Sequence, residues 1–128
     1  MSSISTRGVD PYDYLESRDD ADELIQEFGS LRAVRRVVAS GSPVEPTYTA
    51  TDYPTYAVKV DFSWRQLQGG NINATDQRWL VAAGPLAAIG EVLPTDKIVI
   101  DGAALEIIKV STLKPAGTVV LFDCQVRV

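Results

Sequence analysis

Carboxylates are the most numerous side chains in this sequence that could do chemistry, and many of them gather near the N-terminus. Glu16, Asp19, Asp20 and Glu23 are spaced closely enough to suggest a site for a divalent cation. At helical spacing they all stand on one exposed face, whereas hard cations are usually held by oxygens that converge from several segments. The cluster therefore predicts a solvated acidic face, and neither a metal site nor a cofactor is expected.

Nucleophilic catalysis finds little support in the composition. The 128 residues contain no histidine and a single cysteine, Cys124, which excludes Ser-His-Asp and Cys-His catalysis, most zinc sites and an intrachain disulfide. Cys124 alternates with Phe122 and Val126 on the apolar side of a predicted strand, a setting that favours a buried structural thiol over a reactive thiolate. No catalytic residue is predicted, and the protein is not expected to be an enzyme.

Two further features could bind ligands. The run Gln68-Gly69-Gly70-Asn71 lacks the spacing of a phosphate-binding loop and predicts a flexible loop tip. Trp64 and Trp79, with Arg65 and Arg78, could form a stacking platform for single-stranded nucleic acid or sugar. The plainer interpretation is that the two tryptophans close the mouth of a barrel.

The charge is distributed unevenly along the chain. Residues 1–28 hold eight acidic residues and two arginines, a net charge of −6, whereas residues 29–128 hold nine acidic and ten basic residues. A sequence-specific nucleic-acid binder normally shows an excess of basic residues, so this class is disfavoured. No hydrophobic leader and no long apolar run are found, which predicts synthesis in the cytoplasm and no membrane association.

The acidic segment predicts one helix. Residues 1–10 are interpreted as a flexible arm, and Asp10-Pro11 is a typical helix start that predicts a helix over 11–28, ended by Gly29. One helical face, predicted to pack, carries Tyr14, Arg18, Ala21, Leu24, Ile25 and Phe28. The opposite face, predicted to repel like charges or to meet a basic partner, carries Glu16, Asp19, Asp20, Glu23 and Glu27.

The remainder of the chain alternates short runs of β-forming residues with Gly, Pro, Asn and Asp. The predicted strands are Leu31–Ala39, Thr55–Phe62, Arg78–Ala83, Lys97–Ile100, Leu105–Val110 and Val119–Arg127. This pattern predicts a mainly β fold with one N-terminal α-helix, in which a small six-stranded barrel or sandwich forms a single domain over 11–128. Two connections, Ser40–Pro54 and Ser63–Gln77, are long enough to be functional or mobile loops.

Two strands alternate cleanly. Tyr56, Val58, Val60 and Phe62 share one face of their strand, and Val120, Phe122, Cys124, Val126 and Val128 share the core face of the last strand. Because Val119 and Leu121 make the other face of the last strand apolar at one end, they require a second cover, from the helix or from another subunit.

The order and spacing of these segments resemble the head–tail joining proteins of tailed bacteriophages, also called head-closure or stopper proteins. The resemblance covers Tyr14 to Val128 and includes the helix end Leu24-Ile25-Gln26-Glu27-Phe28-Gly29, the basic strand Leu31-Arg32-Ala33-Val34-Arg35-Arg36-Val37, the segment Asp76-Gln77-Arg78-Trp79-Leu80-Val81-Ala82-Ala83, the segment Pro94-Thr95-Asp96-Lys97-Ile98-Val99-Ile100-Asp101-Gly102, and the ending Val119-Val120-Leu121-Phe122-Asp123-Cys124-Gln125-Val126-Arg127. The sequence departs from the family at Thr95-Asp96, where Gly-Asp is common, and at Cys124, where leucine is common.

The resemblance implies a structural virion protein of the phage neck. Such a protein forms a sixfold or twelvefold ring between the portal or its adaptor and the tail, closes the DNA-filled head, and lets DNA pass without reading its sequence. The nearest alternative is a tail terminator or another neck ring, which would contact the tail tube. An alternative of a different class is a small barrel module that binds oligosaccharide or single-stranded nucleic acid.

Two sets of site residues follow from this interpretation. The nearly neutral loop 63–77 is predicted to face the lumen of the ring or the tail, through Arg65, Gln66, Gln68, Gly69, Gly70, Asn71 and Asn73. Contacts with a neighbouring subunit or the adaptor are predicted for Glu16, Asp20, Glu23, Glu27, Val119 and Leu121.

Overall fold

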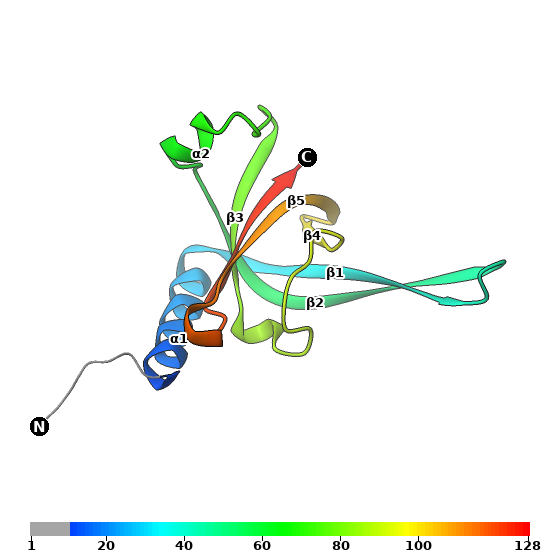
Figure 1. Ribbon diagram of the computed structural model, residues 1–128, viewed down its shortest axis with the longest axis horizontal. Helices are drawn as coiled ribbons and strands as arrows, with labels where there is room; N and C mark the ends of the chain where they lie inside the picture. The colour runs from blue at the N-terminus through cyan, green and yellow to red at the C-terminus, as the bar shows by residue number, and fades with distance from the viewer. Residues whose placement is uncertain (1–10) are drawn as a thin grey trace, which may run out of the picture.

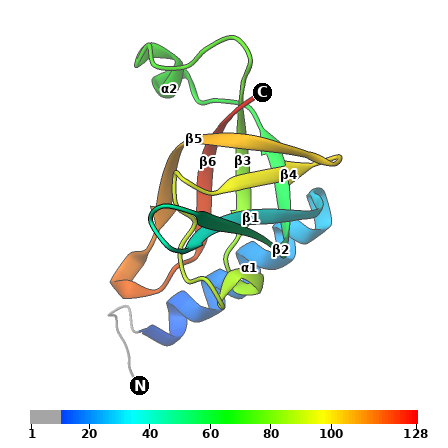
Figure 2. The same ribbon diagram turned by 90° about the vertical axis from the view of Figure 1, so that its right-hand side faces the viewer.

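Six strands of the chain pair antiparallel and close into a barrel in the order β1-β2-β3-β6-β5-β4 (Figures 1 and 2). The computed structural model describes residues 11–128, except for the side chains of residues 11–16 and 116. The elements are α1 (Pro11–Phe28), β1 (Ser30–Gly41), β2 (Pro46–Val60), α2 (Trp64–Gln68), β3 (Asp76–Ala82), the 3-10 turn η2 (Gly84–Leu86), β4 (Lys97–Ile100), β5 (Ala103–Leu113), the 3-10 turn η3 (Pro115–Gly117) and β6 (Leu121–Arg127). The predicted fold class is confirmed. The N-terminal segment 1–10, with the predicted capping residue Asp10, lies outside the described residues.

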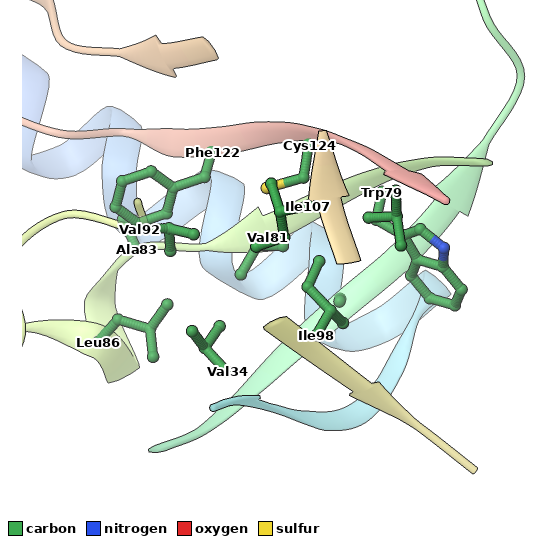
Figure 3. Packing of buried hydrophobic residues seen from close by; sticks show 12 residues of the cluster. Val34, Trp79, Val81, Ala83, Leu86, Val92, Ile98, Ile107, Phe122 and Cys124 are labelled. Atoms are coloured by element: carbon green, nitrogen blue, oxygen red, sulfur yellow. The ribbon is translucent and has the colours of Figure 1, made fainter. Parts of the chain in front are cut away.

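The core fills the barrel interior with side chains from every strand. The predicted core face of the last strand is confirmed, because Val120, Phe122, Cys124 and Val126 are buried. Figure 3 shows Phe122 and Cys124 pointing into the same interior as residues of the other strands. Val128 is exposed, so its predicted burial was wrong; it follows the last residue of β6 and has no neighbouring strand to cover it.

The two faces of β2 are used in the opposite way from the one that the apolar alternation suggested. Thr55 and Ala57 are buried, whereas Tyr56 and Val58 point outward and are half-buried. Thr55 can enter the core because its hydroxyl donates a hydrogen bond to the carbonyl oxygen of Ala82, at 2.9 Å. The outer face of β2 is in turn sheltered by α1, which packs against β2 and β3.

Helix α1 runs along the outside of the barrel at one end (Figure 2), with the bounds that the sequence predicted. Ile25 is buried as expected, but the prediction that Leu24 and Phe28 pack was wrong, because both are mostly exposed. The helix is held through Asp22 instead, whose carboxylate accepts hydrogen bonds from the backbone N–H of Gly84 at 3.1 and 3.3 Å. Burial raises the pKa of the Asp22 carboxyl.

The prediction of a loop over Ser40–Pro54 was wrong, because this segment belongs to a long β-hairpin. β1 and β2 pair without interruption from Ser30↔Ala57 to Gly41↔Pro46, and only residues 42–45 form the turn. Its prolines are tolerated because Pro46 begins the strand and Pro54 lies where β2 has no second neighbour, since β3 pairs only with Ala57–Val60.

Candidate functional site

The outer part of this hairpin, residues 37–50, stands clear of the barrel and is called the arm below (Figure 1). Every residue of the arm is exposed, and Glu45 at the turn is its only charged residue. Because side chains alternate along a strand, one face of the arm carries Val37, Ala39, Tyr48 and Ala50, and the other carries Val38, Ser40, Thr47 and Thr49. The arm is therefore a fully exposed two-stranded ribbon in which most side chains are apolar or β-branched.

Both backbone edges of the arm lack a strand partner within the described chain. β4 pairs with β1 only at Ala33–Arg35, and β3 meets β2 only at Ala57–Val60. A two-stranded ribbon is marginally stable in water on its own. Free edges are a ready template for another chain, and proteins usually protect them with charged residues. The strands of the arm have no such protection.

Ion pairs stiffen the root of the arm. Arg35 binds both oxygens of Asp52, at 2.7 and 3.0 Å, and these hydrogen bonds lower the pKa of the Asp52 carboxyl. Arg36 binds both oxygens of the buried Asp96, at 3.0 and 2.8 Å, and the backbone N–H of Leu93 donates to the same carboxylate. The arm thus projects in a direction fixed by the barrel.

The second long connection, residues 61–75, is called the α2 loop. It is as long as the predicted loop 63–77 but begins and ends two residues earlier, and it is more ordered, because residues 64–68 form α2. A capping box forms this helix: the Ser63 hydroxyl accepts from the N–H of Gln66 at 3.2 Å, and the N–H of Ser63 donates to Gln66 Oε1 at 2.7 Å. Part of the segment that was expected to be a flexible loop is thus a short helix, and the spacing of Ser63 and Gln66 is the local sequence signal for it.

The predicted lumen or tail-interface residues lie together on this loop. Arg65, Gln66, Gly69 and Asn71 line a hollow of about 330 Å³ between α2 and the outer face of β5 and β6. Gln68, Gly70 and Asn73 are exposed.

Asp76 anchors the far end of the α2 loop. Its buried carboxylate accepts hydrogen bonds from Arg127 Nε at 2.9 Å, from Gln125 Nε2 at 2.8 Å and from the N–H of Asn73 at 2.9 Å. The Arg127 guanidinium holds the pKa of this carboxyl well below its usual range. Gln125 Nε2 also donates to the carbonyl oxygen of Asn71, at 3.1 Å. This network joins the loop to β6, and no local sequence pattern predicted it.

The residues predicted to contact a subunit or the adaptor fall into two groups. On α1, Asp20, Glu23 and Glu27 line a shallow groove with Leu24, while the side chain of Glu16 lies outside the described part of the chain. Val119 and Leu121 are half-buried, and α1 contacts both β6, which begins with Leu121, and the 3-10 turn η3 just before Val119.

The side chain of Leu121 is partly exposed. It lines an outer groove of about 380 Å³ together with Leu80 and Leu113, beside the Arg78–Asp123 ion pair. The second cover predicted for the apolar end of the last strand is thus not complete within the described chain.

The two tryptophans do not form a stacking platform, and the preferred interpretation, that both close the mouth of the barrel, is right for Trp79 and wrong for Trp64. Trp79 is only 6% exposed and belongs to the core, with Arg32 over its ring at 5.7 Å. Trp64 lies on α2 and is 76% exposed. Trp79 therefore closes the barrel interior, whereas Trp64 is exposed on the surface. The two rings do not share one face, which removes the observation that favoured a module binding sugar or single-stranded nucleic acid.

Cys124 is fully buried, and burial raises the pKa of its thiol to about 12. This supports the prediction of a structural core residue. Among residues 11–128, no group of three or more histidine, cysteine, aspartate or glutamate side chains is arranged to hold a metal ion. A search of the same range found no helix both long and apolar enough to span a bilayer.

Comparisons of the chain with family models, with characterised proteins and with solved structures found no match.

Proposed function

We propose that this protein is a ring-forming structural protein of the neck of a tailed bacteriophage, which closes the DNA-filled head and offers a docking surface to the tail. The observation that carries this proposal is the arm, residues 37–50. It is long, uncharged along both strands, stiff at its root and unpaired at both edges. The sequence resemblance to head–tail joining proteins supports the same function.

The free edges of the arm favour assembly with further copies of the chain. One edge belongs to β1 and the other to β2, so the β1 edge of one arm can add to the β2 edge of the next. Repeated around an axis, such pairing leaves no edge open when the ring closes. A two-stranded ribbon that is only marginally stable in a single copy would then become part of a larger, more stable sheet.

The lack of charge in the arm suits an element that faces DNA in transit. A basic ribbon would bind phosphates and slow the passage of DNA, and an acidic ribbon would repel it. Apart from Glu45 at its turn, the arm does neither. We place the arm toward the lumen of the ring. The tip of the α2 loop, residues 68–73, carries no charge and is assigned to the lumen or the tail interface.

A shortened arm tests this assignment. Deleting Val37–Ser40 and Thr47–Ala50 joins the native turn to the pair Arg36↔Thr51, and the alternation of faces is kept because an even number of residues leaves each strand. In a phage that depends on this gene, we expect the variant to fold, to be missing from particles, and to leave heads that lose DNA or lack tails. Glu45→Gln, which alters the turn and leaves both edges intact, is the matched control.

Labelling of virions with gold-tagged antibody locates the protein. Label at the junction of head and tail supports the proposal, and label along the upper tail would favour a tail terminator. Absence of the protein from virions, or full infectivity of the shortened-arm variant, would overturn the proposal.

The α2 loop needs a separate experiment. Replacing Gln68–Asn73 with a short Gly-Ser turn removes the loop tip, and thermal unfolding first establishes that the barrel is intact. Gln68→Ala is a milder variant that keeps the hydrogen bonds of Asn71 and Asn73. Leaking or tailless heads support a role at the lumen or tail, whereas full infectivity of both variants refutes it.

A further inference from the structure

Helix α1 presents exposed apolar side chains beside unneutralised acidic ones. Leu24 is 55% exposed and Phe28 is 71% exposed, although both belong to a helix that packs on the barrel. Asp20, Glu23 and Glu27 lie with Leu24 around one shallow groove. Among the described residues, none of these three carboxylates forms an ion pair with a basic residue. These five residues are called the acidic surface.

Helix α2 and the strands next to it present the complementary combination. Trp64 is 76% exposed and Leu67 is 56% exposed. Arg65 lies on α2, Lys109 lines the hollow under α2, and Lys59 lies in β2, five residues before α2 begins. In the part of the chain that the structure describes, none of the three cations has an ion-pair partner. These five residues are called the basic surface, and Asp61 is the one exposed acid next to α2.

Helices α1 and α2, which carry most of the two surfaces, lie at opposite ends of the barrel, as both views show (Figures 1 and 2). A contact between two like surfaces would set acid against acid or base against base, which is unfavourable. A contact between unlike surfaces pairs the carboxylates with the cations and covers apolar groups on both sides. Opposite charge and shared exposed hydrophobics therefore identify a second copy of this chain as the fitting partner.

We propose that the acidic surface of one copy docks on the basic surface of the next copy. This contact is heterologous, so it continues from copy to copy and ends only when a ring closes or a filament forms. It rests on the proposed ring function and names the surfaces that form the ring outside the arm. Leu24, Phe28, Trp64 and Leu67 make the apolar centre, and the charged side chains make a polar rim.

Charge reversal provides the direct test. Glu23→Lys with Glu27→Lys makes the acidic surface basic, and Arg65→Glu with Lys109→Glu makes the basic surface acidic. Each double variant alone should associate with itself at least tenfold more weakly than the native chain in sedimentation velocity at low salt. Mixed in equal amounts, the two variants should recover association, because each then offers the surface that the other lacks.

Controls make the result decisive. Circular dichroism verifies that each variant is folded, which is expected because the four side chains form no ion pair within the described chain. Glu45→Lys changes a charge on the turn of the arm, far from either surface, and should leave association unchanged. Native association that reversal does not weaken, or a folded mixture that does not recover, overturns the proposal.

Cross-linking gives a second measurement that does not depend on charge. In the variant Phe28→Cys with Trp64→Cys, a short bis-maleimide should join chains into ladders, whereas either single variant should give no ladder. Phe28→Cys with Val44→Cys places the second thiol on the exposed turn of the arm and is the mismatched control. Cys124 is buried and does not compete for the reagent. Absence of ladders at concentrations where the double-cysteine variant itself associates overturns the contact.

Failure of this contact can be told apart from failure of the proposed function. If antibody locates the protein at the neck but the cross-link between the thiols introduced at positions 28 and 64 never forms in particles, the ring function stands and the contact is wrong. If the cross-link forms in solution but the protein is absent from virions, the contact stands and the neck function is wrong.

Discussion

The arm and the α2 loop are the two long connections of the barrel, and they keep their shape by different means. The α2 loop is held by side chains: the capping box of Ser63 and Gln66 at one end, and the Asp76 carboxylate at the other. Beyond the ion pairs of Arg35 and Arg36 at its root, the arm is held by backbone pairing and by two exposed hydrogen bonds of Ser40 and Ser42 near its turn. One connection satisfies its polar groups within the molecule, whereas the other leaves two backbone edges open.

The contacts of the α2 loop therefore stabilise the folded monomer, whereas the arm has a fixed shape whose backbone edges are left for a binding partner. Removing the Asp76 side chain at the end of the α2 loop leaves part-buried donors without their acceptor and should lower the free energy of unfolding. Removing residues from the arm orphans nothing in the barrel. Stability measurements on matched variants in the two regions therefore test whether the arm is built for the monomer or for an assembly.

The largest effect on stability is expected at Asp76. Asp76→Ala leaves Arg127, Gln125 and the N–H of Asn73 without their shared acceptor. We expect a loss of about 2 kcal/mol in the free energy of unfolding, measured by urea denaturation. Asp61→Ala removes an exposed carboxylate of the same region and should change stability by less than about 0.5 kcal/mol. Equal effects of the two substitutions would contradict an anchoring role for Asp76.

Acid titration sharpens the same prediction. Because folding lowers the pKa of the Asp76 carboxyl, the charged form stabilises the native state. That stabilisation is fully present above the carboxyl's usual pKa of about 4 and is lost as the pH falls from there toward the lower folded value. Asp76→Asn should remove this part of the acid sensitivity and flatten the fall in unfolding free energy below about pH 4. A fall as steep as that of the native chain would assign the acid sensitivity to other carboxylates.

Much of the fold was predictable from local pattern. Strand Lys97–Ile100 and helix 11–28 have the predicted bounds, and the alternation around Phe122 and Cys124 identified a true core face. These elements have one apolar side or clear end signals, so periodicity and capping were enough to place them.

The errors arose where the environment of a residue is decided far away in sequence. The alternation of Tyr56 and Val58 could not tell which face of β2 looks inward, because α1 shelters the outer face. The prolines of the segment 40–54 favoured a loop, although Pro46 begins β2 and Pro54 lies on an edge that no strand covers. The Thr47–Tyr53 alternation was the available signal for the missed strand.

The network around Asp76 could not be predicted at all. Asp76 and Arg127 lie 51 residues apart and meet only because β3 pairs with β6. The same holds at the root of the arm, where Arg36 and Asp96 are separated by 60 residues. Registers between distant strands determine such pairs, and a single sequence does not display them.

Two serines allow an intermediate comparison. Ser63 accepts a hydrogen bond from the N–H three residues later at the start of α2, and Ser42 does the same at the turn of the arm, at 3.1 Å to the N–H of Glu45. Ser63→Ala should cost about 1 kcal/mol, the usual value of a helix cap. Ser42→Ala should cost less than about 0.5 kcal/mol, because a turn between free strands can fray without opening the barrel. Thermal unfolding of the two single variants measures the difference, and a larger cost at Ser42 would reverse the comparison.

The smallest effect on stability is expected from the largest change, the shortened arm that lacks Val37–Ser40 and Thr47–Ala50. All eight deleted residues are exposed, and none contributes to the buried core. The ion pairs of Arg35 with Asp52 and of Arg36 with Asp96 remain, so the root keeps its geometry. The free energy of unfolding of the monomer should therefore change by less than about 0.5 kcal/mol in urea denaturation at low protein concentration. At high concentration the native chain should gain more stability from association than the shortened chain, since contacts made only by the folded state raise its stability and the shortened chain lacks those of the arm. A loss of about 2 kcal/mol or more in the dilute monomer would mean that the ribbon is part of the folding unit after all, and its exposed edges would then need no partner to explain them.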